Sequence, residues 1–547
     1  MSAGSIPPRA DTFVGDRARS ANASGDTLPA GLLVRRSWAL AVGLILVTLV
    51  VRLTYLIWFS PYQLAGDEAY YWDCARHLSL CYYEKGPGLA WVIAAFCHIL
   101  GDHEWVVRLP VALSCAAAAY VVGRLAMRAS GGNPRAGLLA VVLYLFLPAF
   151  AADAQICTQD GPLILFWALL TAWGLRLFAR EDGLQATIWD WSMGGFVLGL
   201  AFLFKQSALL FLAGAVPYAV IYRRRLPVAS RLAIYILAAS AAVLVTVSPM
   251  IVWNARHGWP TLTHTLGHLG APGGDHDAGK DRYFSLISPL ALVGAQLGAV
   301  GIPALLAMTL ACRRAFRDRD ADPQRWAIRL WMICASVPAI AFFVALSFVK
   351  PVIGSWPFPS YVPLVVLVAD VLTSPGGDRS GRPPMGNACR IWLIYGAAGC
   401  LLISFPNVLS ALPVVGGKFE QRVMKRVTGH REHATELQTL IDANHDPQGR
   451  PPLIITRYYM DTALDAFYLP GRPHVFDAGV LTGQRPTSYE FWPDNDLSSA
   501  ELLGRSAVLD GFSPTRPWDR VLRFRSLRRI EGTRCFVAEG YQGPLTR

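Results

Sequence analysis

Long apolar segments alternate with short polar loops along most of the chain, and this alternation stops near residue 412. A helix needs about 20 apolar residues to cross the hydrocarbon core of a bilayer. The run at 88–100 is too short to span comfortably, so it predicts a helix lying at the membrane surface. Eleven longer segments predict membrane-spanning helices, with 11 to 13 as the expected range: 38–59, 106–128, 135–152, 161–180, 188–204, 207–222, 231–253, 289–312, 328–349, 354–373 and 389–412.

The segments on either side of this region have a different character. Residues 1–37 are rich in Arg, Ser, Ala and Gly and lack the apolar core and cleavage site of a signal peptide, which predicts a disordered cytoplasmic tail. After residue 412, helical periodicity at 430–446 and 461–472 alternates with short β-rich runs, PLIIT, SAVLD and TRCFVAEG. This pattern predicts a small α/β domain over 413–547. The chain shows no internal repeat.

Composition and charge add an orientation to this picture. The chain is 53% hydrophobic and 16% charged, with a mean hydropathy of +0.35, which excludes an ordinary soluble protein. Arginines gather in alternate short loops, and such loops face the cytoplasm. The remaining loops and the α/β domain are then expected on the opposite, outer side of a multi-pass membrane protein. The net charge of +12 follows from this topology, so we expect a membrane partner and no nucleic acid.

The segment GDEAYYWDCARHLSLCYYEKGP, residues 66–87, places carboxylates, aromatic rings and a Glu-Lys pair directly outside the first predicted span. Asp67 precedes a helical pattern, so it is either a helix N-cap or a functional carboxylate. Cys74 and Cys81 both fall on the outer side, where a disulfide would persist, but their spacing does not decide whether they are bonded.

Several motifs, in order along the chain, resemble those of a known family. GDEAYYW, YYEKGP and GDHEWVVRLPVAL are followed by TQDGPLILFWAL and GLAFLFKQSALL. Together they resemble the polyprenyl-phosphate-dependent glycosyltransferases of the GT-C fold, the relatives of protein O-mannosyltransferases and of the lipid A aminoarabinose transferase (families 39 and 83). The resemblance implies a catalytic membrane domain over 38–412, with its main catalytic loop at 60–105. It also implies transfer with inversion from an undecaprenyl-type phosphate to lipid A, another glycolipid or a protein. The resemblance places this reaction at a bacterial inner membrane, with the catalytic loops and the α/β domain in the periplasm.

The same resemblance suggests roles for charged residues. Asp67 matches the family's candidate base, and Glu68 would orient the acceptor or instead complement the helix dipole. Lys85 matches a lysine that would stabilise the departing phosphate. Arg108 and Lys205 would bind donor in the same way, or they simply reach toward lipid headgroups.

Other candidates lie in neighbouring loops. Asp160 is a predicted catalytic carboxylate that would pair with Lys205, or else a helix cap. Tyr82 and Tyr83 would line a substrate groove, or they belong to an interfacial aromatic belt. His264 and His268 are four residues apart and are weak candidates for a divalent metal, which some relatives bind nearby; no other cofactor is expected.

A multispanning lipid or sugar transporter is the alternative. It predicts ionisable residues in mid-membrane and paired repeats. The acidic residues cluster at one face instead, which favours the transferase.

Overall fold

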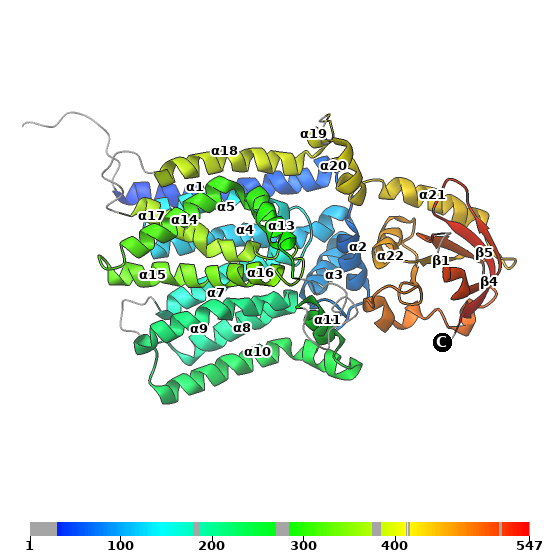
Figure 1. Ribbon diagram of the computed structural model, residues 1–547, viewed down its shortest axis with the longest axis horizontal. Coiled ribbons are helices and arrows are strands. Elements are labelled where there is room, and N and C mark those ends of the chain that lie inside the picture. The colour runs from blue at the N-terminus through cyan, green and yellow to red at the C-terminus, as the bar shows by residue number, and fades with distance from the viewer. Residues whose placement is uncertain are drawn as a thin grey trace, which may run out of the picture.

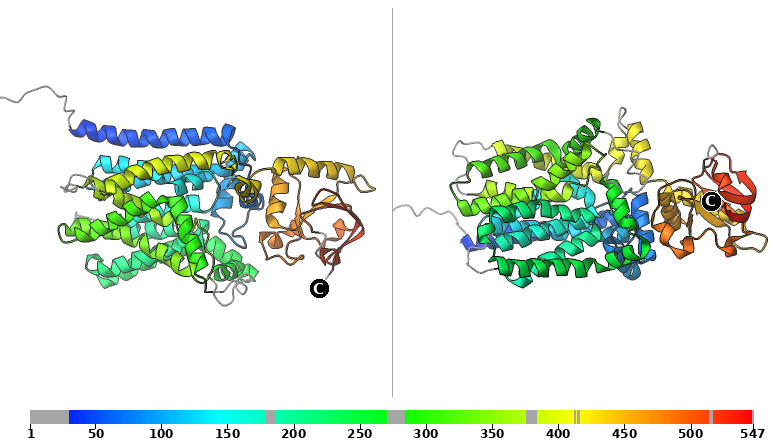
Figure 2. Two further views of the ribbon diagram at one scale, coloured as in Figure 1. Left: turned by 45° about the horizontal axis from the view of Figure 1, so that its top comes forward. Right: turned by 60° about the horizontal axis from the view of Figure 1, so that its bottom comes forward.

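The protein is a helical bundle with a small α/β domain at one end, as the views in Figures 1 and 2 show. The computed structural model describes residues 30–178, 186–269, 284–374, 384–411, 413, 416–513 and 517–545. Residues 1–29 of the predicted tail lie outside the described residues. Helix α1 begins at Ala30, so the end of that predicted tail is helical.

All eleven predicted spans contain helix. Seven helical segments of the described chain are long and apolar enough to cross a membrane, and the others are shorter. The helices are α1 (Ala30–Thr54, extended by a π-helical turn at Tyr55–Phe59), α4 (Glu104–Ala129), α5 (Pro134–Leu145), α7 (Asp160–Phe178), α8 (Ile188–Phe204), α9 (Leu212–Ile221), α10 (Ala229–His257), α13 (Ile287–Gln296), α14 (Ile302–Arg317), α15 (Pro323–Cys334), α16 (Val337–Ser347), α17 (Val362–Thr373) and α18 (Pro384–Ser404).

Two predicted spans end earlier than the hydrophobic pattern indicates. The span at 135–152 is interrupted because Pro148 starts a separate helix, α6 (Pro148–Asp153). The span at 389–412 ends with α18 at Ser404. Two short helices, α19 (Asn407–Ser410) and α20 (Gly416–Arg422), follow before the α/β domain, which we call the outer domain.

Short helices cover the end of the bundle that faces the α/β domain. These are α2 (Gly66–Arg76), the predicted surface helix α3 (Gly88–Leu100) and α11 (Pro260–His268) (Figure 1). Buried aromatic residues of α2, including Tyr70 and Trp72, share a hydrophobic cluster with Phe467 and Tyr489 of the outer domain. The α/β domain is therefore joined to the bundle through a common core at α2.

The outer domain is built on a five-stranded mixed sheet of order β2-β1-β3-β5-β4. The three predicted β runs form β1, β3 and β5, while β2 and the arginine-rich edge strand β4 were not predicted. Strands β2, β1 and β3 are parallel, and β5 pairs antiparallel with both β3 and β4. The elements are α21 (His430–Ala443), β1 (Leu453–Thr456), α22 (Tyr459–Tyr468), β2 (Phe476–Asp477), β3 (Ala507–Asp510), β4 (Leu522–Arg529) and β5 (Phe536–Pro544).

Candidate active site

Helix α2 carries Asp67 to the junction between the bundle and the outer domain. Gly66, at the start of α2, lies so close to α22 that a Cβ atom there would be 2.5 Å from the Cβ of Met460. Glycine therefore permits the close packing that brings Asp67 to α22. The hydroxyl of Tyr459 donates a hydrogen bond to Oδ1 of Asp67 at 3.2 Å. Burial, together with the charge of Asp67, raises the pKa of Tyr459, so Tyr459 keeps the proton that it donates.

Asp67 is available for chemistry. Its side chain is 52% exposed, and its Oδ1 lies 3.6 Å from Nζ of Lys85. The N-cap residue of α2 is Ala65, and the carboxylate that accepts from the Ala65 N–H belongs to Glu68, at 2.9 Å. The capping alternative for Asp67 is therefore wrong, because the side chain that caps the start of α2 is that of Glu68.

Lys85 is held in an aromatic enclosure. Its ammonium lies 3.8 Å from the centre of the Tyr71 ring and 4.7 Å from that of Tyr70, and it has no hydrogen-bond partner among the described residues. The next residue, Gly86, packs against the end of α8, where a Cβ atom would lie 2.0 Å from the carbonyl oxygen of Leu203. The EKGP segment thus fixes Lys85 beside Asp67 while its ammonium keeps hydrogen-bonding capacity for a ligand.

A second ion pair lies where α7 begins and α8 ends. Nζ of Lys205 is 2.5 Å from Oδ1 of Asp160, which confirms the predicted pairing of these two residues. The Ser355 hydroxyl donates a hydrogen bond to Oδ2 of Asp160 at 3.0 Å. The ring of Trp356 lies 5.7 Å from the Lys205 ammonium. Asp160 is buried against Lys205, and this geometry favours a role in which Asp160 holds the Lys205 ammonium in position.

Glu68 and Arg108 form a buried pair. Two nitrogens of Arg108 donate to the two carboxylate oxygens of Glu68 at 2.8 and 2.7 Å, and each side chain is almost fully enclosed. Glu68 also accepts from the Cys157 N–H, and Arg108 donates to the carbonyls of Tyr62 and Gln63. The geometry supports neither the predicted catalytic role of Glu68 nor substrate binding by Arg108, because their polar atoms join α2 and α4 to each other and to the loops before α2 and α7.

Breaking this pair is expected to destabilise the fold. Arg108→Met leaves the Glu68 carboxylate buried without its countercharge, which typically costs about 3–5 kcal/mol. Thermal unfolding of the purified protein, followed by tryptophan fluorescence, should show a markedly lowered midpoint. Arg431→Met provides the control, because Arg431 is 63% exposed in its ion pair with Glu104 and such pairs contribute about 0–1 kcal/mol. Equal losses in both variants would contradict the structural role.

The tyrosines of the YYEKGP segment are buried. The Tyr82 hydroxyl donates to the backbone carbonyl of Cys74 at 2.7 Å, so a substrate-binding role for Tyr82 is not supported. Tyr83 stacks on Phe491. Cys74 and Cys81 are both free and buried.

The sequence interpretation missed Glu84 as a site residue. Its Oε2 accepts hydrogen bonds from the hydroxyls of Tyr70 and Ser488, and its Oε1 lies 3.7 Å from Arg485 of the outer domain. Its place beside Lys85 in a family motif was the available signal.

Two cavities border this part of the chain, one through Glu84 and the other through Asp67. The first, of about 540 Å³, lies among the outer parts of α8, α10, α11 and α16, and is mostly apolar with Glu84, Lys205, His264 and His268 in its wall. The second, of about 680 Å³, lies between α2 and the outer domain, with Asp67 in its wall. Its lining includes a group of basic residues, which are Lys425, Arg426, His430 and Arg534. We call these the apolar cavity and the basic cavity.

The predicted metal candidates both lie in α11, where the rings of His264 and His268 are 4.4 Å apart. Glu84 lines the same cavity, and its Oε1 makes no hydrogen bond within the described residues. Imidazole and carboxylate are ordinary ligands of divalent ions, but among the described residues these three side chains do not form a group whose ligand atoms all lie within 4.8 Å of one another, so the metal stays a prediction.

Comparison with known proteins gives consistent matches. Residues 84–253 match the family described as dolichyl-phosphate-mannose-protein mannosyltransferase. The lipid A galacturonosyltransferase RgtD of Rhizobium johnstonii is 28% identical over 337 residues, which are 59% of this chain and 65% of that protein. The undecaprenyl phosphate-alpha-4-amino-4-deoxy-L-arabinose arabinosyl transferase of Pseudomonas aeruginosa strain PAO1 is 26% identical over 316 residues, 56% of this chain and 52% of that protein. The chain thus spans less than two thirds of the length of these curated relatives.

Solved structures agree in fold. ArnT from Cupriavidus metallidurans in the apo state superposes with a TM-score of 0.56 at 16% identity, covering 91% of this chain and 97% of ArnT. The same protein bound to undecaprenyl phosphate gives a TM-score of 0.55 at 16% identity, covering 93% and 98%. The chain therefore has the GT-C fold of ArnT, and its sequence is similar to glycosyltransferases of the kind that the loop motifs resemble.

Proposed function

We propose that the protein transfers a sugar from a polyprenyl-phosphate carrier to lipid A or a closely related anionic glycolipid. The observation that carries this proposal is the Asp67–Lys85 pair, with Asp67 in the wall of the basic cavity and Glu84, the chain neighbour of Lys85, in the wall of the apolar cavity. A lipid-linked phosphate donor needs an apolar channel that ends at a cation, and an anionic acceptor needs a basic surface facing the same carboxylate. The similarity to RgtD and to the aminoarabinose transferase supports this pairing of donor and acceptor.

The apolar cavity suits the donor. Side chains such as Phe202, Leu209 and Phe343 would contact prenyl units, while Lys205 offers positive charge where the cavity meets α7. ArnT, which shares this fold, has been solved with undecaprenyl phosphate. The ammonium of Lys85, enclosed by tyrosine rings, is placed to meet the sugar phosphate, since a charge with few competing partners interacts strongly in a low-dielectric site.

The basic cavity suits the acceptor. Lys425, Arg426 and Arg534 give it a positive wall opposite Asp67, and phosphate groups bind such clusters through charge-assisted hydrogen bonds. An acceptor oxygen held there would face the anomeric carbon of a sugar whose phosphate contacts Lys85.

The reaction follows from this placement. The acceptor oxygen bonds to the anomeric carbon while the bond from that carbon to the phosphate oxygen breaks, and polyprenyl phosphate leaves with the electron pair. Lys85 stabilises the charge that develops on the phosphate. Asp67 accepts the proton of a hydroxyl acceptor, or stabilises the oxocarbenium-like sugar when the acceptor is already ionised. A divalent ion held by Glu84, His264 and His268 would supply further positive charge for the donor phosphate.

The proposed orientation places both cavities and the outer domain in the periplasm. A cysteine introduced at His445, which is exposed in the outer domain, should react with a membrane-impermeant maleimide in intact cells. A cysteine at Asp320, exposed between α14 and α15, should react only after the membrane is permeabilised. Each is scored against the unmodified chain, whose ten cysteines are the background. The reverse labelling pattern would overturn the orientation.

The function itself is tested by mass spectrometry of lipid A, core oligosaccharide and membrane lipids from a deletion strain. One sugar should be lost from lipid A or a related glycolipid. It should return fully with the intact gene, and with the Asp67→Asn variant only in part for a phosphate acceptor and hardly at all for a hydroxyl acceptor. Loss of a sugar from secreted proteins alone would redirect the proposal to a protein acceptor. Unchanged glycans together with altered lipid transport would favour the transporter.

A further inference from the structure

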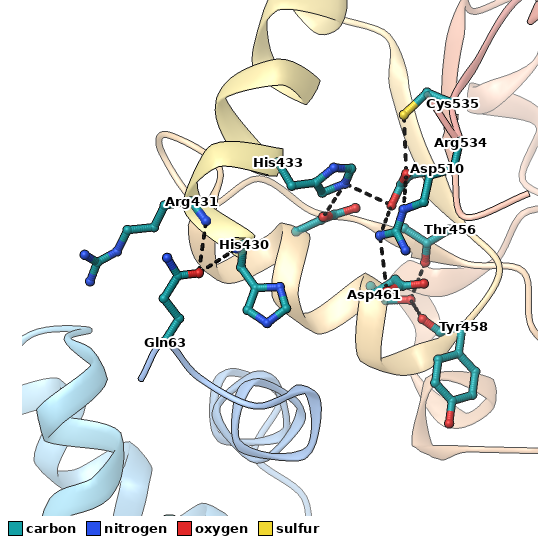
Figure 3. A network of polar contacts seen from close by, with 12 residues as sticks. Gln63, His430, Arg431, His433, Thr456, Tyr458, Asp461, Asp510, Arg534 and Cys535 are labelled. Atoms are coloured by element: carbon teal, nitrogen blue, oxygen red, sulfur yellow. Dashed lines mark hydrogen bonds and ion pairs between the residues drawn. The ribbon is translucent and has the colours of Figure 1, made fainter. Parts of the chain in front are cut away.

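Three elements of the outer domain bring possible metal ligands together beside the basic cavity. His433 lies in the first turn of α21, Asp465 in α22, and Asp510 at the end of β3. Nε2 of His433 is 3.2 Å from Oδ2 of Asp510 and 3.7 Å from Oδ1 of Asp465. Figure 3 shows His433 and Asp510 pointing toward one another from α21 and the sheet.

The cluster carries more buried negative charge than its neighbours balance. Asp461, Asp465 and Asp510 lie together, and Arg534 pairs with Asp510 at 2.9 Å and with Asp461 at 3.3 Å. Asp465 is 3% exposed, and its Oδ2 has no hydrogen-bond partner within the described part of the chain. A buried carboxylate oxygen without a partner costs stability unless a cation or an ordered water satisfies it.

We propose that His433, Asp465 and Asp510 bind a divalent transition-metal ion of the zinc type. A tetrahedral site with ligands at about 2.0–2.1 Å separates neighbouring ligand atoms by roughly 3.3 Å, close to the two distances observed. The three ligand atoms all lie within 4.8 Å of one another. A dication also balances the three carboxylates together with Arg534.

The surroundings complete the site. His433 is 23% exposed, so water reaches the fourth position from the side of the basic cavity. Arg534 donates to both oxygens of Asp510 and thereby orients this ligand, as outer hydrogen bonds commonly do. One imidazole and two carboxylates suit zinc better than magnesium, which prefers oxygen ligands.

The ion would fix the wall of the basic cavity. His433, Asp461 and Arg534 all line that cavity. The first turn of α21 is also tied to the membrane domain, because the Gln63 side chain accepts hydrogen bonds from the backbone N–H groups of His430 and Arg431 (Figure 3). A metal joining α21, α22 and β3 is thus a positioning element for the acceptor side.

Zinc content tests the proposal independently of transfer activity. The full chain is purified without a histidine tag in a His264→Ala, His268→Ala, His474→Ala background, in which the last change removes the other group of possible ligands, His77, His474 and Asp494. It is stripped with EDTA, equilibrated with ZnCl₂ and measured by elemental mass spectrometry. We expect one zinc per chain. Asp465→Asn and His433→Gln should each weaken zinc binding by on the order of 100-fold or more, since loss of an outer-shell partner alone costs about 10–100-fold.

Asp461→Asn is the matched control. It removes the same charge from the same helix, but Asp461 pairs with Arg534 and not with His433, so zinc should be retained. For variants that do not fold, X-ray absorption of the zinc-loaded background chain should show nitrogen and oxygen ligands at about 2.0–2.1 Å. Absence of stoichiometric zinc in the background chain, or equal zinc in Asp465→Asn and Asp461→Asn, would overturn the proposal.

Discussion

Asp67→Asn is expected to lower sugar transfer by about 10²- to 10⁴-fold with a hydroxyl acceptor, the usual contribution of a general base. The change keeps the size of the side chain and removes its charge. Because Glu68, not Asp67, accepts from the N-terminus of α2, the helix start should survive the substitution. Transfer measured in reconstituted membranes, with the amount of folded protein matched by gel filtration, gives the comparison.

The nature of the acceptor sets the size of this effect. An acceptor phosphate is already ionised, so the loss should then be smaller and should reflect orientation and oxocarbenium stabilisation. Asp442→Asn, an exposed carboxylate on the outer face of α21, should leave transfer unchanged and serves as the control. Full activity of Asp67→Asn with both kinds of acceptor would remove Asp67 from the mechanism.

Lys85→Ala is expected to lower kcat by about 10²- to 10³-fold, comparable to removing one preorganised donor from an oxyanion site. The contact strengthens as charge moves onto the departing phosphate, so turnover should fall more than donor affinity. Single-turnover kinetics with the lipid-linked donor separate the two quantities.

Lys85→Arg should recover part of this loss, since it keeps the charge but changes the donor geometry. Lys418→Ala, at an exposed position of α20, is the control for a general loss of positive charge. A raised KM with normal kcat would show that Lys85 only binds the carrier.

The membrane helices were predictable because a helix that crosses the bilayer needs an apolar run of a known length, about 20 residues. Where the observed helix ends differ from the predicted ones, the cause is local; Pro148, for example, starts a new helix and so interrupts the span predicted at 135–152. The strands β1, β3 and β5 were visible as short β-rich runs, whereas β2 has only two residues and the exposed face of β4 is too charged to show alternation.

The candidate site was only partly predictable. The Asp67–Lys85 pair falls within one motif, and the Asp160–Lys205 pair was anticipated from two charges at one membrane face. Glu68 and Arg108 were assigned to chemistry because a single sequence does not reveal that side chains 40 positions apart bury one another. The contact of Tyr459 with Asp67 spans 392 positions and carries no local signal.

The contact between α2 and α22 has a consequence for engineering acceptor choice. Exchanging the outer domain between relatives would transplant α22 without its partner, leaving a foreign residue where Met460 packs on Gly66 and where Tyr459 meets Asp67. Two segments that are far apart in the sequence are therefore expected to determine acceptor choice together. They are the turn from Gln63 to Glu68 and the helix from Tyr459 to Tyr468. Recombination that moves both together should preserve a working enzyme where a swap of the whole domain fails.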